Sequence, residues 1–222
     1  MINKIMNFIK LFLKKSEKVI EEQTKEDYYN SKYPTQNVLY RRTDKFGKLN
    51  IDVRQFINPR NFALPIIDGE VDDEKALNSL NWVRNNLKYV SDSKQFGLPE
   101  YWAFSYETLN RKKDDCEGGA ILLTNIMLKN GIPNWKIRVN CGNVQNPYTK
   151  KLEGHAYVSY YCEESDKWVL LDWCYLPNSL DISNRKNYKD ENIYKDIWFS
   201  FNEENAYGRD ADLRRAKKFL NN

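Results

Sequence analysis

The sequence contains a single histidine, His155, and only four cysteines among its 222 residues. One imidazole excludes any chemistry that needs two. Four cysteines are too few for a disulfide scaffold, and no pair has C-x-x-C spacing, which excludes zinc-ribbon and thioredoxin-type sites. No stretch approaches the roughly 18 uninterrupted apolar residues of a membrane span. We therefore do not expect an integral membrane protein.

Apolar residues make up 41% of the chain and aromatic residues 14%, enough for a sizeable core and too much for a mainly disordered chain. The net charge of +4 is concentrated at the ends. Residues 1–20 carry +4 and residues 209–222 carry +3, which leaves −3 for the middle. An acidic body with basic ends predicts no nucleic-acid-binding groove.

Four parts are expected along the chain. Residues 1–22 predict an amphipathic helix, because isoleucines recur at three- and four-residue steps with lysines on another side. A polar linker is expected at 23–37, a domain at 38–205 and a basic helix at 206–222. The apolar start is broken by polar residues and lacks a small-residue cleavage site, so a cytoplasmic rather than secreted protein is expected. The N-terminal helix is a candidate for docking onto a protein partner or a membrane surface.

The central domain is predicted to have an α+β fold. Helices are predicted over 72–89 and 116–130, the second ended by Gly131 and Pro133. The segment 91–110 reads as a loop. Three strands are predicted after the second helix, at 135–139, 156–161 and 167–174. A further strand, at the edge of the sheet, is possible at 197–201.

Cys116 stands at the start of the stronger helix, within KDDCEGGA at residues 113–120. A helix N-terminus carries partial positive charge and unpaired N–H groups, which favour a nucleophilic thiolate and can stabilise an oxyanion. Gly118 and Gly119 leave room for something to approach the first turn. The alternative is a small buried apolar residue, and the acidic, glycine-rich flanks argue against deep burial.

His155 and Asp172 are the candidate partners of this cysteine, in EGHAYV at 153–158 and WVLLDW at 168–173. If the two segments form a hairpin, side chains alternate between faces with period two. A two-residue turn would pair His155 with Cys174 and put Asp172 on the same face, and a four-residue turn keeps that parity. A three- or five-residue turn would separate them, and the sequence does not decide the turn.

A helix that begins at Asp-Cys-Glu, followed by a Gly-His-Ala strand and a Leu-Asp strand, resembles the transglutaminase-like superfamily of papain-like cysteine enzymes. Bacterial and phage transglutaminase-like cysteine peptidase domains look most similar. The resemblance continues upstream in WVRNNLKYVSD at 82–92 and ETL at 107–109, and covers about residues 70–176. The family often has Gly-Asp-Cys-Glu-Asp, whereas here Asp114 replaces the glycine and Gly118 the second acid.

The resemblance implies a papain-like fold with the nucleophile-bearing helix packed on an antiparallel sheet. It implies that Cys116 is the nucleophile, His155 the general base and acid, and Asp172 the residue that orients His155. The expected reaction is peptide or amide hydrolysis of a protein or peptide substrate, with transamidation possible and no metal or organic cofactor. Trp102 is a candidate oxyanion donor through its indole N–H, against the alternative of a core or cleft-wall aromatic.

A second hypothesis is a catalytically inactive member of the fold that serves as a structural or interaction module. A virion component is conceivable, and the location would then be the host cytoplasm or the virion. Reactivity of the Cys116 thiol separates the two hypotheses, because a scaffold does not need an activated cysteine.

Overall fold

The computed structural model describes residues 37–44, 47–60, 63–175 and 181–208, together with Ala216 and Leu220. All of these belong to the unit Gln36–Asn222. The predicted N-terminal helix at 1–22, nearly all of the linker at 23–37 and most of the basic helix at 206–222 lie outside the described residues. Within the described part of the chain, no helix is both long and apolar enough to cross a membrane.

A five-stranded antiparallel sheet forms the centre of the fold, in the order β7-β6-β5-β8-β9. The strands are β5 (Ile137–Gln145), β6 (Leu152–Cys162), β7 (Lys167–Leu171), β8 (Tyr194–Phe201) and β9 (Ala206–Gly208). The strand predicted at 197–201 is present as part of β8, but its predicted place at the edge was wrong, because β9 pairs with the outer side of β8. β9 is too short to produce a sequence period, and it carries the sheet past residue 205.

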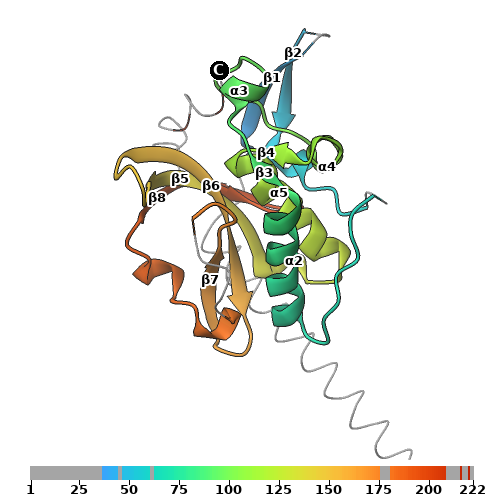
Figure 1. Ribbon diagram of the computed structural model, residues 1–222, viewed down its shortest axis with the longest axis vertical. Helices are drawn as coiled ribbons and strands as arrows, with labels where there is room; N and C mark the ends of the chain where they lie inside the picture. The colour runs from blue at the N-terminus through green and yellow to red at the C-terminus, as the bar shows by residue number, and fades with distance from the viewer. Residues whose placement is uncertain are drawn as a thin grey trace, which may run out of the picture. The chain divides into compact units, whose positions relative to one another are not determined.

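Helix α5 (Cys116–Lys129) packs on β6 and β5, and α2 (Asp72–Asn86) lies beside it (Figure 1). The helix ends as predicted, with Gly131 in a left-handed conformation at φ 87°. Every residue of 116–127 is buried, so α5 is enclosed on all sides rather than along one face. Helix α2 stops short of the predicted end because β3 (Lys88–Tyr89) pairs with β4 (Lys113–Asp114).

The remaining elements precede α5 or connect the later strands. They are β1 (Leu39–Asp44), β2 (Gly47–Asp52), η1 (Val53–Phe56), α3 (Asp92–Gln95), α4 (Ser105–Arg111), η2 (Asn134–Lys136), η3 (Ile182–Asn184) and η4 (Tyr188–Asp190). The segment 91–110, predicted as a loop, contains α3 and α4. Both are too short to show a helical period, which explains why the sequence did not reveal them.

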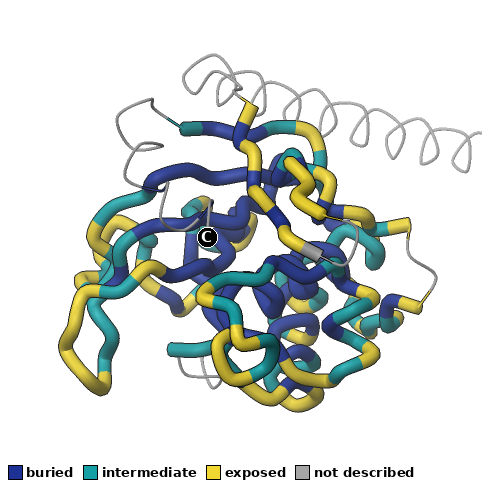
Figure 2. The backbone as a smooth tube through the Cα atoms, turned by 90° about the horizontal axis from the view of Figure 1, so that it is seen from above, coloured by how far each residue is buried: buried dark blue, intermediate teal, exposed yellow. Residues whose placement is uncertain are grey.

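One main hydrophobic core joins the sheet, α2 and α5 to the N-terminal hairpin. Trp102 is fully buried in it and its ring stacks on Tyr40, Phe199 and Phe201. Figure 2 shows the buried residues at the centre of the molecule and the exposed ones in the outer loops. The core therefore holds the first turn of α5 against the sheet.

The β6–β7 hairpin decides which side chains share a face. Cys162 pairs with Lys167, and this register, continued along the strands, sets His155 opposite position 174. It is the register that the two-residue-turn alternative gave. The strand predicted at 167–174 ends at Leu171, so Asp172 is the first residue beyond β7.

Candidate active site

Cys116 is the first residue of α5 and is 7% exposed. The expectation that its polar flanks would prevent burial was wrong, because other acidic groups and an indole ring enclose it. Trp173 Nε1 donates to the Cys116 carbonyl over 3.2 Å. A Cβ at Gly119 would lie 2.2 Å from the Trp173 ring, so only glycine permits this contact. The site wall, and not an incoming molecule, fills the space at Gly119.

Gly118 likewise leaves room for the side chain of Asp114. A Cβ there would come within 2.2 Å of the Asp114 carboxyl carbon. Asp114 is buried and accepts hydrogen bonds from Thr108 Oγ1 at 2.6 Å and Arg111 Nη2 at 3.0 Å. Positions 114 and 118 both depart from the common family motif, and the absence of a side chain at Gly118 makes room for the carboxyl group of Asp114.

His155 and Asp172 meet at the end of the β6–β7 hairpin. His155 Nε2 lies 2.8 Å from Asp172 Oδ2, and the side chains are 3% and 0% exposed. Asp172 Oδ1 accepts from the backbone N–H of Cys174 at 2.7 Å and of Tyr175 at 3.3 Å. Because Nε2 faces Asp172, the other ring nitrogen is left for Cys116, with which His155 interacts. The three predicted residues are thus brought together.

Opposing effects set the protonation of this group. Burial would lower the pKa of His155, but the charges of Asp172 and Cys116 raise it to about 10. Burial would raise the pKa of Asp172, yet His155 holds it below its usual value. The pKa of the Cys116 thiol is raised by burial, with further increases from Asp115 and Glu100, while His155 acts to lower it.

A cluster of carboxyl groups adjoins the cysteine, all of them buried except the half-buried Glu100. Its members are Asp92, Glu100, Asp115 and Glu117. One ligand atom from each residue lies within 4.8 Å of the others in three overlapping groups, which are Asp92 with Glu100 and Glu117, Asp92 with Asp114 and Asp115, and Asp115 with Cys116 and Glu117. Cys116 Sγ donates to Glu117 Oε2 over 3.2 Å. Between pairs of described residues, no lysine or arginine forms an ion pair with any of the four. The cluster is a candidate site for a cation.

Crowding of like charges in a buried place favours the protonated form of these groups. Burial, with the charge of Asp115, raises the pKa of Asp92 to about 8 and that of Glu100 to about 9. The same effects raise the pKa of Glu117 well above its usual value. One oxygen each of Asp92, Asp115 and Glu117 is buried and receives no hydrogen bond from an N–H or hydroxyl group of the described chain.

Trp102 is placed differently from the other predicted residues. Its indole Nε1 donates to Glu100 Oε1 over 3.3 Å, and its ring lies in the aromatic core. This position favours the alternative of a core aromatic, because the indole donor is turned toward the carboxyl cluster. Trp173, next to Asp172, instead covers the first turn of α5.

The sequence analysis assigned no role to several residues at the site. Tyr194 OH donates to Asp172 Oδ2 over 2.7 Å, and Arg84 Nη2 donates to the Asp172 carbonyl over 2.6 Å. Tyr175 stacks on the His155 ring with centroids 4.5 Å apart. Tyr194 lies beyond the segment of resemblance, and nothing in its neighbourhood distinguishes it from the other tyrosines.

The helix that begins at Cys116 and the antiparallel sheet on which it packs define a papain-like class of fold. The chain belongs to the transglutaminase-like superfamily, whose family model matches residues 60–173, just over half of the chain. The match begins before α2 and ends one residue after Asp172. It therefore includes the segments that carry Cys116, His155 and Asp172, and leaves β8 and β9 outside.

Solved structures of LapG from Legionella pneumophila are similar to this chain at low identity. An EGTA-treated LapG structure is 19% identical over 63% of this chain and 68% of that one, with a TM-score of 0.47. A calcium-bound LapG structure is 20% identical over 63% and 78%, with a TM-score of 0.45. A candidate cysteine protease from Cytophaga hutchinsonii is 20% identical over 63% and 41%, with a TM-score of 0.33. No curated protein matches the chain.

The carboxyl cluster predicts that the metal-free protein loses stability as pH rises. Asp92 and Glu100 bind protons more tightly in the folded state, so their contribution is full below pH about 4 and is lost as pH rises through about 8 and 9. His155 acts with the same sign. In EGTA we expect Tm to fall by about 5 °C or more between about pH 6 and about pH 9, measured by circular dichroism.

The double variant Asp92→Asn with Glu100→Gln is the control. It removes two of the titrating groups and leaves His155 and the other acids of the cluster, so the dependence of Tm on pH should become shallower. A wild-type Tm that rises over this interval would contradict the assignment of raised pKa values.

Proposed function

We propose that the chain is a cysteine-dependent peptide or amide hydrolase. The observation that carries this proposal is the buried His155–Asp172 pair beside a cysteine at the N-terminus of α5. A free cysteine in a core does not need an imidazole held by a buried carboxylate. The polar groups around Cys116 support its role as a nucleophile rather than the alternative of a small apolar core residue.

In the proposed reaction His155 takes the thiol proton and Cys116 Sγ attacks the substrate carbonyl carbon. The oxyanion forms near the backbone N–H groups at the start of α5. His155 then protonates the leaving amine, the C–N bond breaks, and an acyl-enzyme remains. Water activated by His155 releases the acid product and restores the thiol. If an amine replaces water, the same acyl-enzyme gives transamidation.

Asp172 fixes the ring of His155 and stabilises its protonated form. Its carboxylate is itself held by two backbone N–H groups, and Arg84 binds the carbonyls of Asp172 and Trp173 from α2. The pair is therefore preorganised by β6, by the turn after β7 and by α2.

The carboxyl cluster fits a calcium ion. Calcium prefers several oxygen ligands and tolerates irregular geometry, and Asp92, Glu100, Asp115 and Glu117 supply carboxyl oxygens, some without a hydrogen-bond donor. When bound, the ion would offset the negative charge that raises the pKa of Cys116. Glu117 would then serve the cation instead of accepting from the thiol. A metal was not expected from the sequence, and the buried acids are the reason for this revision.

Replacing the nucleophile tests the proposed reaction. We expect Cys116→Ala to abolish cleavage of casein and of a mixed peptide library, followed by mass spectrometry, while Tm stays within a few degrees of wild type. Cys141→Ala is the matched control, because Cys141 is a buried cysteine on β5 that the proposed mechanism does not use. Cleavage that persists in Cys116→Ala would contradict the mechanism.

The same experiment separates hydrolysis from transamidation. Monodansylcadaverine supplied with casein would be incorporated at glutamine by a transamidase, whereas a hydrolase gives new peptide termini. We expect new termini with little incorporation. If wild type does neither and resembles Cys116→Ala, the structural or interaction module becomes the better account.

Removal and addition of calcium test the cation site. We expect calcium to raise the Tm of the EGTA-treated wild type by several degrees, because a ligand that binds only the folded state stabilises it. Titration calorimetry in two buffers of different ionisation enthalpy should report proton release as the ion displaces protons from the acids. Asp92→Asn with Glu100→Gln should abolish both effects.

Asp73→Asn is the matched control for this test. The Asp73 carboxylate accepts from Tyr160, Cys162 and backbone N–H groups, so its oxygens already have donors. Its replacement should leave calcium binding intact. Equal Tm values with calcium and with EGTA in wild type would overturn the cation site and leave the hydrolase proposal standing.

A further inference from the structure

Asp172 Oδ2 is shared between two donors. His155 Nε2 lies 2.8 Å from it, and the hydroxyl group of Tyr194 donates to it over 2.7 Å. The other oxygen, Oδ1, is bound by the backbone N–H groups of Cys174 and Tyr175. Among the contacts that described residues make with this carboxylate, the one from Tyr194 is made by a side chain outside the segment that matches the family.

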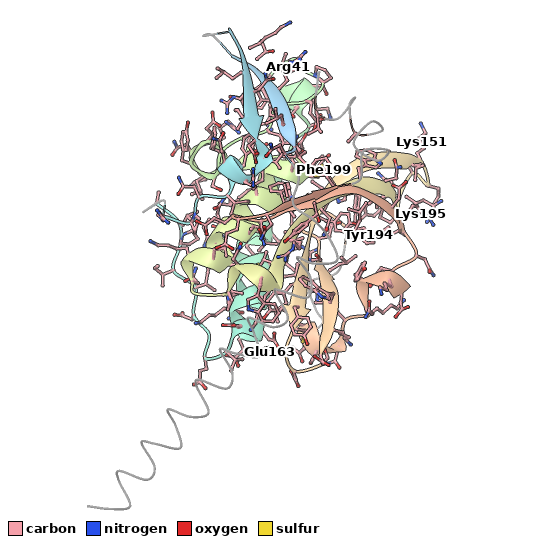
Figure 3. The ribbon with its side chains drawn as sticks, turned by 180° about the vertical axis from the view of Figure 1, so that it is seen from behind. Arg41, Lys151, Glu163, Tyr194, Lys195 and Phe199 are labelled. Atoms are coloured by element: carbon pink, nitrogen blue, oxygen red, sulfur yellow. The ribbon has the colours of Figure 1, made fainter. Side chains whose placement is uncertain are left out.

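Tyr194 reaches this position from the first residue of β8. Figure 3 shows Tyr194 and Lys195 at the start of β8, at the same end of the sheet as Lys151. The Tyr194 ring packs on Tyr157, with centroids 4.5 Å apart and planes at 60°. β8 pairs with β5, and β5 pairs with β6, which carries His155. The hydroxyl group is therefore held by the same sheet as the histidine.

The hydroxyl group of Tyr194 acts as a hydrogen-bond donor to Asp172. Burial, together with the charge of Asp172, raises the pKa of Tyr194 well above its usual value, so the phenol stays protonated and donates. The hydrogen bond from Tyr194 is one of the contacts that lower the pKa of Asp172. A donor at Oδ2 also fixes the direction in which this oxygen faces the imidazole.

We propose that Tyr194 is a positioning residue of the catalytic group, which holds Asp172 Oδ2 in place against His155. This inference rests on the proposed hydrolase mechanism and extends it to the part of the sheet beyond the family match. Tyr194 does not touch the reacting atoms. It acts through Asp172, and removal of its hydroxyl should therefore change how the reactivity of Cys116 depends on pH.

The test is the rate of alkylation of Cys116 by iodoacetamide between pH 4 and 9 on the full chain with calcium present, located by peptide mass spectrometry. In Tyr194→Phe the carboxylate loses a donor and Asp172 retains its proton to higher pH. The imidazolium is then less stabilised and the thiolate is lost earlier on acidification. We expect the acid limb to move up by about one pH unit, which is about a tenfold slower reaction on that limb.

Tyr160→Phe is the matched control. Tyr160 is a buried tyrosine on β6 whose hydroxyl donates to Asp73 Oδ1 over 2.6 Å, the same type of bond without a histidine. Its loss should lower Tm by a similar amount and leave the alkylation profile of Cys116 unchanged. If Tyr194 contributed only to stability, Tyr194→Phe and Tyr160→Phe would have the same alkylation profile for Cys116.

A double-variant cycle tests whether Tyr194 acts through Asp172. On the Asp172→Asn background, Tyr194→Phe should have no further effect on the acid limb. If Tyr194→Phe does not fold, a fluorinated tyrosine at 194 keeps the hydroxyl and the shape while making the phenol a stronger donor. The acid limb should then move down.

The outcomes distinguish the two claims. A wild-type profile of an ordinary thiol, unaffected by His155→Ala, overturns the hydrolase mechanism and with it the role of Tyr194. An activated wild-type profile that is unchanged in Tyr194→Phe, or by the fluorinated tyrosine, overturns only the role of Tyr194. A shift that is equally large in Tyr160→Phe, or that persists on the Asp172→Asn background, also overturns that role.

Discussion

The bond between His155 and Asp172 is the interaction on which the site depends. An imidazole buried among strands would lose its proton, because burial penalises the charged form, unless a carboxylate lies beside it. Asp172 meets this need and is buried itself, so it must be satisfied in turn. The turn after β7 and the start of β8 supply donors to its carboxylate, and Arg84 on α2 donates to its main-chain carbonyl. Much of the surrounding fold therefore serves one carboxylate.

The second constraint is the charge around the cysteine. An imidazolium on one side favours the thiolate, whereas the carboxyl groups on the other side oppose it. Protonation of Asp92, Glu100 and Glu117 reduces this opposition at the cost of stability at high pH. In the proposed account a calcium ion replaces those protons. The reactivity of Cys116 and the occupancy of the carboxyl cluster are then linked by electrostatics over a few ångströms.

The sequence was informative where a local pattern determined the structure. The C-terminal end of α5 followed from Gly131 and Pro133, and the two-residue turn, one of the alternatives, gave the register that brings His155 and Asp172 together. Contacts between distant segments were not predictable in this way. Glu100 joins the carboxyl cluster from a loop and Tyr194 joins Asp172 from β8, and neither has a period or motif around it. Trp102 was singled out as an indole donor, but its stacking partners come from two other parts of the chain.

The pH dependence of Cys116 alkylation in wild type and in His155→Ala, each with calcium bound, tests the central claim most directly. The account predicts a thiolate that persists well below the ordinary cysteine pKa of about 8.5 in wild type. In His155→Ala the profile should return to that of a buried thiol and react only at higher pH. Coincident profiles in the two proteins would show that no nucleophile–imidazole pair exists and would contradict the account.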